Sequence, residues 1–203
     1  MNLLKFILCW LFLLPINSFI YGQSDSSHMF KYYNLRACKI TYEFFDGLNQ
    51  GEKTVIFDDS GFYEKEIVVA HMGSNSIMKD SILARFSKKD VNALAIKTPQ
   101  SIYSIDLDTR TGTIQDRRSS PFGDEFFSSS KKMIGRDTIL SRPCEIAQYE
   151  NAMKVWYWKN IALKKQMVVD GIIIQECATS IDELYSIKKD EFAVPKGVVL
   201  QNQ

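Results

Sequence analysis

The stretch 142–181, RPCEIAQYENAMKVWYWKNIALKKQMVVDGIIIQECATSI, constrains the fold more than any other part of this chain. Short runs rich in β-branched and aromatic residues are separated there by polar pairs that favour turns, Glu150-Asn151, Lys159-Asn160 and Asp170-Gly171. Asp-Gly is a preferred two-residue turn of β-hairpins. The stretch therefore predicts four strands in an antiparallel meander.

The first 22 residues have the pattern of a secretory signal peptide. Lys5 is followed by an apolar run from Phe6 to Leu14, a proline at position 15 and a polar-to-small approach that ends at Gly22. The apolar run is too short for a membrane anchor, because a bilayer core about 30 Å thick needs roughly 20 apolar residues in a helix. We expect cleavage after Gly22 and a periplasmic or secreted product of Gram-negative-type export, with no transmembrane segment in the mature chain.

The expected mature chain, residues 23–203, is electrically balanced. Removing the leader removes one of the 25 Lys and Arg residues and none of the 24 Asp and Glu residues, which leaves 24 of each. Basic residues are interleaved with acidic ones rather than clustered, so we expect no nucleic-acid partner. The length suits a single domain with a sizeable core.

The first half of the mature chain also has the rhythm of a β protein. Within 36–45, Cys38, Ile40, Tyr42 and Phe44 alternate with polar residues, which predicts a half-buried strand. Further strands are expected at 54–57, 62–69, 81–86, 93–97, 101–107 and 113–117, with a loop at 71–80. Short loops between the first three strands make them antiparallel neighbours. The apolar tail at 192–197 contains proline and glycine and is expected to pack across the sheet.

The period changes between Pro121 and Ile134. Asp124 can cap a short helix that carries Phe126, Phe127 and Met133-Ile134, and lysines near its end suit the helix dipole. We expect this helix to cover one face of the sheet.

Three cysteines remain in the mature chain, Cys38, Cys144 and Cys177. An oxidising compartment would allow two of them to pair, and Cys144 with Cys177 is the favoured pair because both lie in the meander. The alternative is that all three are small buried apolar residues.

The sequence contains no convincing catalytic or metal-binding pattern. A zinc site needs three or four converging ligands, whereas this chain has only His28 and His71 and no closely spaced cysteine pair. The run 106–112 resembles a calcium loop, but Arg110 occupies a ligand position, so a polar hairpin turn is the better interpretation. Two Ser-x-x-Lys matches, at Ser76 and Ser128, lack the companion motifs of serine hydrolases. We expect a non-enzymatic protein without a cofactor or metal.

Aromatic residues carry the remaining signal. Val155, Trp156, Tyr157 and Trp158 are apolar on both faces of one strand, which indicates either cover on both sides or one face that lines a cavity. A strongly curved sheet with an incompletely filled concave side fits this pattern.

Several segments resemble uncharacterised exported bacterial proteins related to the LolA/LolB lipoprotein-carrier fold. They are Gly135-Arg136-Asp137-Thr138-Ile139, the run Val155 to Lys164, the Asp170-Gly171 turn, Ala178-Thr179 and Phe192-Ala193-Val194-Pro195. The resemblance implies an antiparallel, strongly curved half-barrel sheet, mainly β within an α+β class, whose concave face is covered by one or a few short helices and can hold acyl chains.

Together these observations give the hypothesis of a soluble periplasmic binding protein for an acyl chain, a lipid or another apolar ligand. The ligand would contact Tyr42, Phe44, Tyr103, Trp156 and Trp158, with Phe126 and Phe127 as a lid. The alternative is an envelope-associated structural or protein-interaction module with a filled core.

Overall fold

The structure is a computed structural model that describes residues 32–47, 49–72, 90–117, 131–149, 153–169 and 171–202. Several expectations concern residues outside these ranges and stay predictions. They are the leader 1–22, the strand at 81–86, the serines Ser76 and Ser128, His28, the turn at Glu150-Asn151 and the helix at 121–134 up to residue 130, with Phe126 and Phe127.

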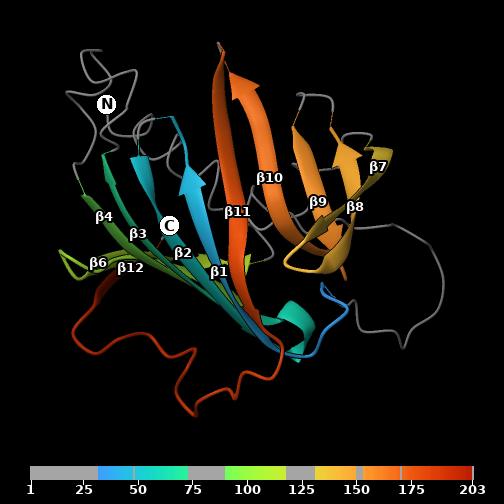
Figure 1. Ribbon diagram of the computed structural model, residues 1–203. Helices are drawn as coiled ribbons and strands as arrows, with labels where there is room; N and C mark the ends of the chain where they lie inside the picture. Colours follow the sequence, from blue (N-terminus) through green and yellow to red (C-terminus); the bar gives the residue numbers. More distant parts are fainter. Residues whose placement is uncertain are drawn as a thin grey trace.

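The described residues form one sheet of twelve strands (Figure 1). The strands are β1 (Cys38–Phe45), β2 (Asn49–Asp58), β3 (Tyr63–Met72), β4 (Asp90–Lys97), β5 (Ser101–Asp106), β6 (Thr111–Asp116), β7 (Lys132–Ile139), β8 (Arg142–Gln148), β9 (Lys154–Trp158), β10 (Ile161–Val169), β11 (Ile172–Asp182) and β12 (Val199–Asn202). Their order in the sheet is β12-β6-β5-β4-β3-β2-β1-β11-β10-β9-β8-β7. Among these described strands, only the β12–β6 pair is parallel. The predicted fold class, a mainly β protein with an antiparallel open sheet, is confirmed.

The predicted meander is confirmed as β8 to β11. Lys159 and Asn160 join β9 to β10 with positive φ angles of 50° and 63°, the conformation that a two-residue hairpin turn of type I′ requires. Gly171 has φ 81° in the next turn. The polar pairs in the sequence therefore marked these turns for a physical reason, because asparagine and glycine accept positive φ at the lowest cost.

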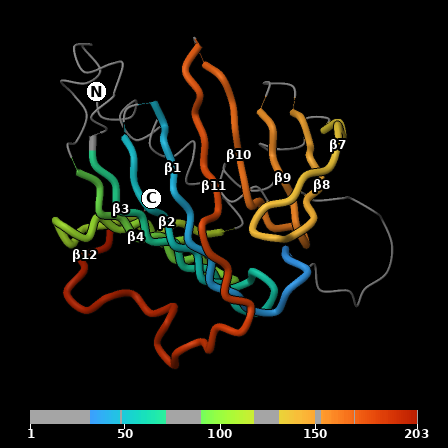
Figure 2. The backbone as a smooth tube through the Cα atoms, in the orientation of Figure 1, coloured from blue at the N-terminus to red at the C-terminus, as the bar shows by residue number. Residues whose placement is uncertain are grey.

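The sheet is strongly curved rather than flat. Register shifts interrupt the ladders at Thr41/Tyr42, Ala162/Lys164 and Met133/Gly135. Such β-bulges bend a strand and increase its twist. Figure 2 shows the result, with β3 to β6 turned away from the direction of β8 to β10, so that the sheet has a concave and a convex face.

Residues 32–36, ahead of β1, connect two distant turns. The Tyr33 N–H donates to the Ser60 carbonyl oxygen at 3.0 Å, and the Ser60 N–H donates to the Arg36 carbonyl oxygen at 2.8 Å. The Asn34 N–H donates to the Lys159 carbonyl oxygen at 2.9 Å. Ser60 lies in the 3-10 turn η1 (Asp59–Gly61) between β2 and β3, so this segment joins that turn to the β9–β10 turn.

The segment 183–198 crosses the outer face of β3 to β6 before it returns as β12. Its apolar residues pack on Leu94, Ile96 and Ile105. The side chains of these three residues lie on the outer face of the sheet, opposite the concave face. Lys65 and Glu191 form an ion pair at 3.0 Å that fixes the crossing segment to β3. The expectation that the tail packs across the sheet is confirmed. The residues that pack there are Phe192, Val194, Val198 and Leu200.

Several elements differ from the sequence predictions. Strands β2 and β4 begin earlier than the predicted 54–57 and 93–97. Met133 and Ile134 were expected in a helix but belong to edge strand β7, where seven of the eight residues are exposed. An edge strand that is exposed on both faces has no two-residue hydrophobic period, so its pattern could not be recognised. His71 and Met72, expected in a loop, extend β3, and the short strand β12 was not anticipated.

Gly51 offers a test of the close contact between β2 and β3. A Cβ atom added at this glycine would lie 2.2 Å from the Val69 carbonyl oxygen and 2.6 Å from the Ala70 Cα, both backbone atoms that cannot rotate away. We expect Gly51→Ala to lower the free energy of unfolding by about 1–3 kcal/mol, as overpacking does.

The matched control is Gly135→Ala in β7, where the nearest atom to an added Cβ is Ile146 Cδ1 at 3.9 Å. Urea denaturation of both variants measures the difference. Equal stability of the two variants would contradict the close strand contact.

Candidate functional site

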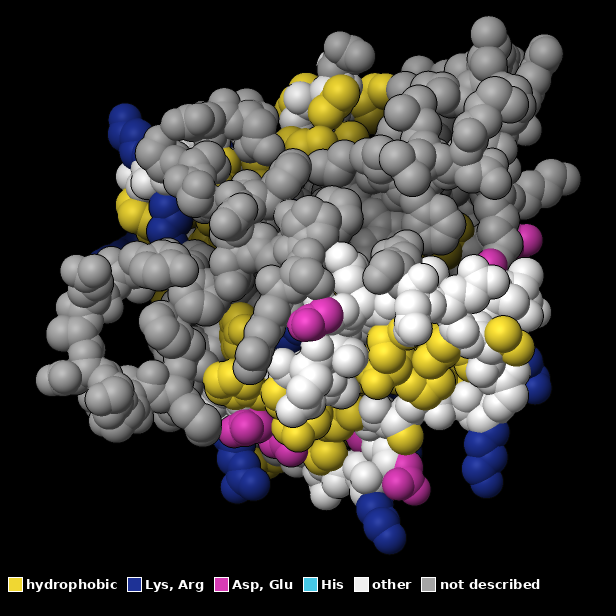
Figure 3. All heavy atoms as spheres, turned by 180° about the vertical axis from the view of Figure 1, so that it is seen from behind, with side chains coloured by type: hydrophobic (Ala, Val, Ile, Leu, Met, Phe, Trp, Pro, Cys, Tyr) yellow, Lys and Arg dark blue, Asp and Glu magenta, His cyan; other side chains and the backbone are white. Residues whose placement is uncertain are grey.

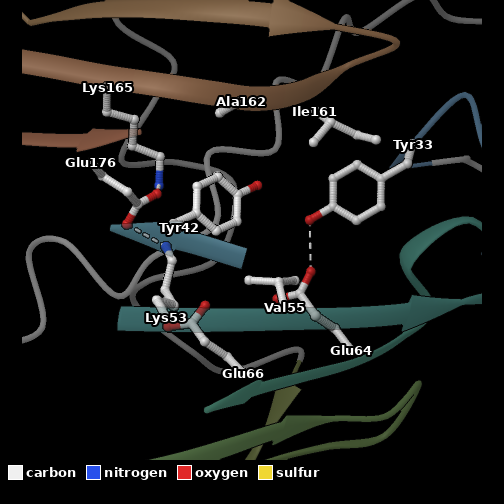
Figure 4. A pocket seen from close by; sticks show the side chains of 10 residues that line it. All are labelled: Tyr33, Tyr42, Lys53, Val55, Glu64, Glu66, Ile161, Ala162, Lys165 and Glu176. Atoms are coloured by element: carbon white, nitrogen blue, oxygen red, sulfur yellow. Dashed lines mark hydrogen bonds and ion pairs between the residues drawn. The ribbon is translucent and has the colours of Figure 1, made fainter. Parts of the chain in front are cut away.

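The concave face holds a cavity of about 30 Å³ (Figure 4). Strands β3 and β10 are separated in the sheet by β2, β1 and β11, so their side chains can meet only where the sheet curves around its concave side. Ten residues line the cavity: Tyr33, Tyr42, Lys53, Val55, Glu64, Glu66, Ile161, Ala162, Lys165 and Glu176. Half of them are charged, although all five charged side chains are buried.

Strand register places the first group of charges around Glu176. Lys165 of β10 is the direct partner of Glu176 in the β10–β11 ladder, and its Nζ is 3.2 Å from Glu176 Oε1. Lys53 of β2 contacts the other carboxylate oxygen of Glu176 and lies 4.9 Å from the centroid of the Tyr42 ring. Burial raises the pKa of Glu176, but Lys165 and Lys53 outweigh it, so the pKa lies below its usual value. Glu176 is therefore ionised and shared by two ammonium groups.

The second group is centred on Glu64. Lys97, directly opposite on β4, lies 2.7 Å from Glu64 Oε1, and the Tyr33 hydroxyl donates to Oε2 at 2.6 Å. Burial alone would raise the pKa of Glu64, but Lys97 and the two hydrogen bonds lower it below its usual value. Both oxygens of this carboxylate thus have a partner.

Glu66 has the least complete set of contacts in the cluster. Its Oε1 is buried and has no hydrogen-bond partner among the described residues. Burial raises the pKa of Glu66 from 4.5 to about 7, although Lys53 and Lys97 oppose the increase. Its side chain points toward the cavity between Lys53 and Glu64 (Figure 4).

The size and lining of this cavity do not suit an acyl chain. Ligand pockets usually enclose about 300–1,000 Å³ and are mostly apolar. A cavity of about 30 Å³ has room for water molecules or a very small polar group. This cavity therefore does not match the acyl-chain hypothesis, which stays a prediction.

Of the described residues predicted to contact a ligand, only Tyr42 lines the cavity. Phe44 lies two residues further along the same face of β1 and is half-buried. Tyr103 lies on the opposite face, in the cluster covered by the tail, because it pairs with Ile96 while Lys97 faces the cavity side.

The two tryptophans do not line the cavity, although they belong to the same hydrophobic cluster as Tyr33, Tyr42, Val55 and Ile161, which do. Val155 pairs with Lys165 and packs with Ala147, Tyr149, Met153 and Tyr157, so Trp156 and Trp158 point to the other side of β9. Their rings are covered by cations: Lys164 lies 4.7 Å from the Trp156 ring centroid and Lys159 lies 4.6 Å from that of Trp158. The Trp156 Nε1–H donates to Asp137 Oδ2 at 3.0 Å. Both faces of the strand are covered, which was one of the two interpretations of its sequence.

The three cysteines are free thiols in the structure. Strands β9 and β10 lie between β8, which carries Cys144, and β11, which carries Cys177, so the predicted bridge is absent. Cys38 and Cys144 are fully buried and Cys177 is half-buried, as expected of small apolar residues. Burial raises the pKa of Cys38 to about 12, which keeps this thiol protonated.

The charged residues of the cavity were missed by the sequence analysis. Glu64 and Glu66 share a face of β3 with Val68 and Ala70, and Lys53 shares a face of β2 with Val55 and Phe57. The sequence signal for these residues was a charged residue that alternates with apolar residues on one face of a strand. This signal was weak, because the opposite face of β3 also contains both charged and apolar residues.

No protein-family model matches this sequence. No curated protein matches it either. Among solved structures, an uncharacterised conserved protein from Thermus thermophilus has a TM-score of 0.56 and 9% sequence identity, over 84% of this chain and 93% of that chain. The described sheet therefore has the same fold as that protein. MucB, solved in complex with MucA(peri), has a TM-score of 0.40 and 9% identity, over 74% of this chain and 51% of that chain, and this likeness does not establish a shared fold.

Metal-binding clusters and membrane-spanning helices are both absent from the described residues. These residues contain no group of three or more His, Cys, Asp or Glu side chains that could hold a metal ion. No helix among them is long and apolar enough to cross a membrane.

Proposed function

We propose that this chain is an exported, non-enzymatic protein-interaction module that binds another envelope protein through the end of its β10–β11 hairpin. We define the hairpin end by four residues: Val168, Val169, Ile172 and Ile173. The observation that carries the proposal is the exposure of this apolar group. The exposed fraction is 58% for Val168, 41% for Val169 and 50% for Ile173.

The geometry of the hairpin places the four residues together. Val168 pairs with Ile173 and Val169 pairs with Ile172, so each face of the hairpin end carries one apolar pair. The hairpin extends further than β1 and β9 on either side of it (Figures 1 and 2). Figure 3 shows hydrophobic side chains gathered at the top of the molecule, where this hairpin ends in Figure 1. Clustered apolar side chains on a surface favour association with a partner.

The composition of the hairpin favours a protein over a membrane as the partner. Residues 166–175, QMVVDGIIIQ, contain no Lys, Arg, Trp or Tyr and include one acidic residue. Segments that insert at a lipid surface usually carry basic and aromatic residues at the interface. The small charged cavity also favours a protein partner over a lipid. It is too small and too polar for an acyl chain, which fits the alternative of an interaction module with a filled core.

Photo-crosslinking in cells tests this proposal directly. A photoreactive amino acid at position 173 is expected to form one discrete protein adduct, identified by mass spectrometry. Adducts with phospholipid alone, or no adduct at all, would contradict it.

Once the partner is identified, Val168→Lys is expected to weaken binding by about tenfold or more, because it places a charge in an apolar contact. The matched control is Val69→Lys on β3, since Val69 is 54% exposed and lies outside the hairpin. Titration calorimetry compares the two variants. Equal losses of affinity would show that the hairpin end is not the contact surface.

A further inference from the structure

The concave face carries a cluster of six charged side chains on five strands, five of them buried and Lys97 partly buried. One member of the cluster, Glu66, lacks a full set of partners. Lys53, Lys97 and Lys165 stand against Glu64, Glu66 and Glu176, so the cluster is neutral only when all three carboxyl groups are ionised. Each of Glu64 and Glu176 forms direct ion pairs. Within the described part of the chain, Glu66 has no ion pair and retains a buried oxygen without a hydrogen-bond partner.

Strand register explains why Glu66 differs from Glu64. Glu64 lies opposite Lys97 on β4, whereas Glu66 lies opposite Ala95 on β4 and Val55 on β2. Its neighbours across both ladders are therefore apolar. Lys53, a lysine of the same cavity lining, contacts Glu176.

We propose that Glu66 is a buried proton-binding site of the concave face, which sets the charge of the cavity lining and makes the stability of the fold respond to pH near neutrality. When Glu66 holds a proton, its carboxyl group needs no cation, and the cluster carries three lysines against two carboxylates. When Glu66 is ionised, the charges balance, but a carboxylate oxygen without a partner is buried, which is costly.

The groups that face this site come from every element around it. They are Tyr33 of the segment before β1, Tyr42 of β1, Lys53 of β2, Glu64 of β3, Lys97 of β4, Lys165 of β10 and Glu176 of β11. Burial raises the pKa values of Tyr33 and Tyr42, so both stay protonated. The pKa values of Glu64 and Glu176 are lowered, so both are ionised near neutral pH. Burial lowers the pKa of Lys165, although Glu176 opposes the decrease, whereas at Lys53 burial is outweighed by Glu176 and Glu66, which raise the pKa. Glu66 is thus the carboxyl group of the cluster that exchanges a proton in this range.

The sign of the pH effect follows from the raised pKa of Glu66. Between pH 4.5, its ordinary value, and about pH 7, the unfolded chain has released a proton that the folded chain still holds. The unfolding equilibrium constant therefore rises by up to about tenfold for each pH unit in this window. The stabilisation is complete below the window and lost above it.

The experiment compares the unfolding equilibrium of the unaltered chain and of Glu66→Gln at pH 5 and pH 8. The amide cannot ionise, so the ratio of the two unfolding constants is expected to change by at least about tenfold between these pH values. Glu145→Gln, which removes an exposed carboxylate on β8, is the matched control and is expected to leave the ratio unchanged. The same ratio for Glu66→Gln at both pH values would overturn the proposal.

A second measurement uses only the unaltered chain and so does not depend on whether a variant folds. The ¹³C carboxyl resonance of Glu66 in the unaltered chain is expected to titrate near pH 7. A midpoint below about pH 5, the ordinary range of a glutamate, would overturn the proposal even if Glu66→Gln did not fold.

Discussion

Replacing Glu176 by alanine is expected to lower the free energy of unfolding by roughly 3–5 kcal/mol, the range found when one partner of a buried ion pair is removed. Glu176 is 2% exposed and accepts contacts from Lys53 and Lys165, which are 3% and 5% exposed. Without the carboxylate, two ammonium groups would remain buried side by side. Urea denaturation at neutral pH measures the loss.

A triple variant, Lys53→Met, Lys165→Met and Glu176→Leu, separates the cost of unpaired charge from the cost of lost packing. Replacing a whole buried ionic group by apolar residues of similar volume is often neutral or stabilising. The triple variant is therefore expected to recover most of the stability that Glu176→Ala loses. If Glu176→Ala cost less than about 1 kcal/mol, the cluster would be reached by water and would not have the buried character described above.

The same cluster shows which parts of this structure could be predicted from the sequence and which could not. Alternation in 36–45, the Lys159-Asn160 pair and Gly171 predicted local structure correctly, because each signal depends on neighbouring residues alone. The cavity lining depends on which side chains meet across β3 and β10, which have three strands between them in the sheet and lie about 100 residues apart in sequence. Local sequence patterns do not predict contacts between side chains of such distant strands.

The aromatic residues show the same limit of local sequence patterns, because here the pattern suggested a cavity wall that the structure does not contain at this position. Trp156 and Trp158 suggested a cavity wall because their strand is apolar on both faces. The structure places cations from β8, β10 and the β9–β10 turn over their rings, so the second face is covered without a ligand. A lysine or arginine can cover an aromatic ring with its stem and its charge. Sequence periodicity treats such residues as polar and cannot predict this cover.

Phe57→Ala is expected to be the most destabilising single change in the apolar core, with a loss of about 3–5 kcal/mol in the free energy of unfolding. Phe57 is fully buried in the main hydrophobic cluster, and its ring centroid lies 4.3 Å from that of Tyr33. The effect extends beyond the cavity that alanine would leave. Tyr33 carries the hydroxyl that donates to Glu64, and its backbone joins the segment before β1 to the β2–β3 turn.

Phe57→Leu is the matched control, because it retains most of the apolar volume and is expected to cost less than the alanine variant. Denaturant unfolding followed by tryptophan fluorescence compares the two, since Trp156 and Trp158 belong to the same cluster as Phe57. A loss below about 1 kcal/mol for Phe57→Ala would contradict a close-packed core at this position. A large loss for alanine with a small loss for leucine would show that apolar packing, and not only the charged cluster, holds the N-terminal segment against the curved sheet.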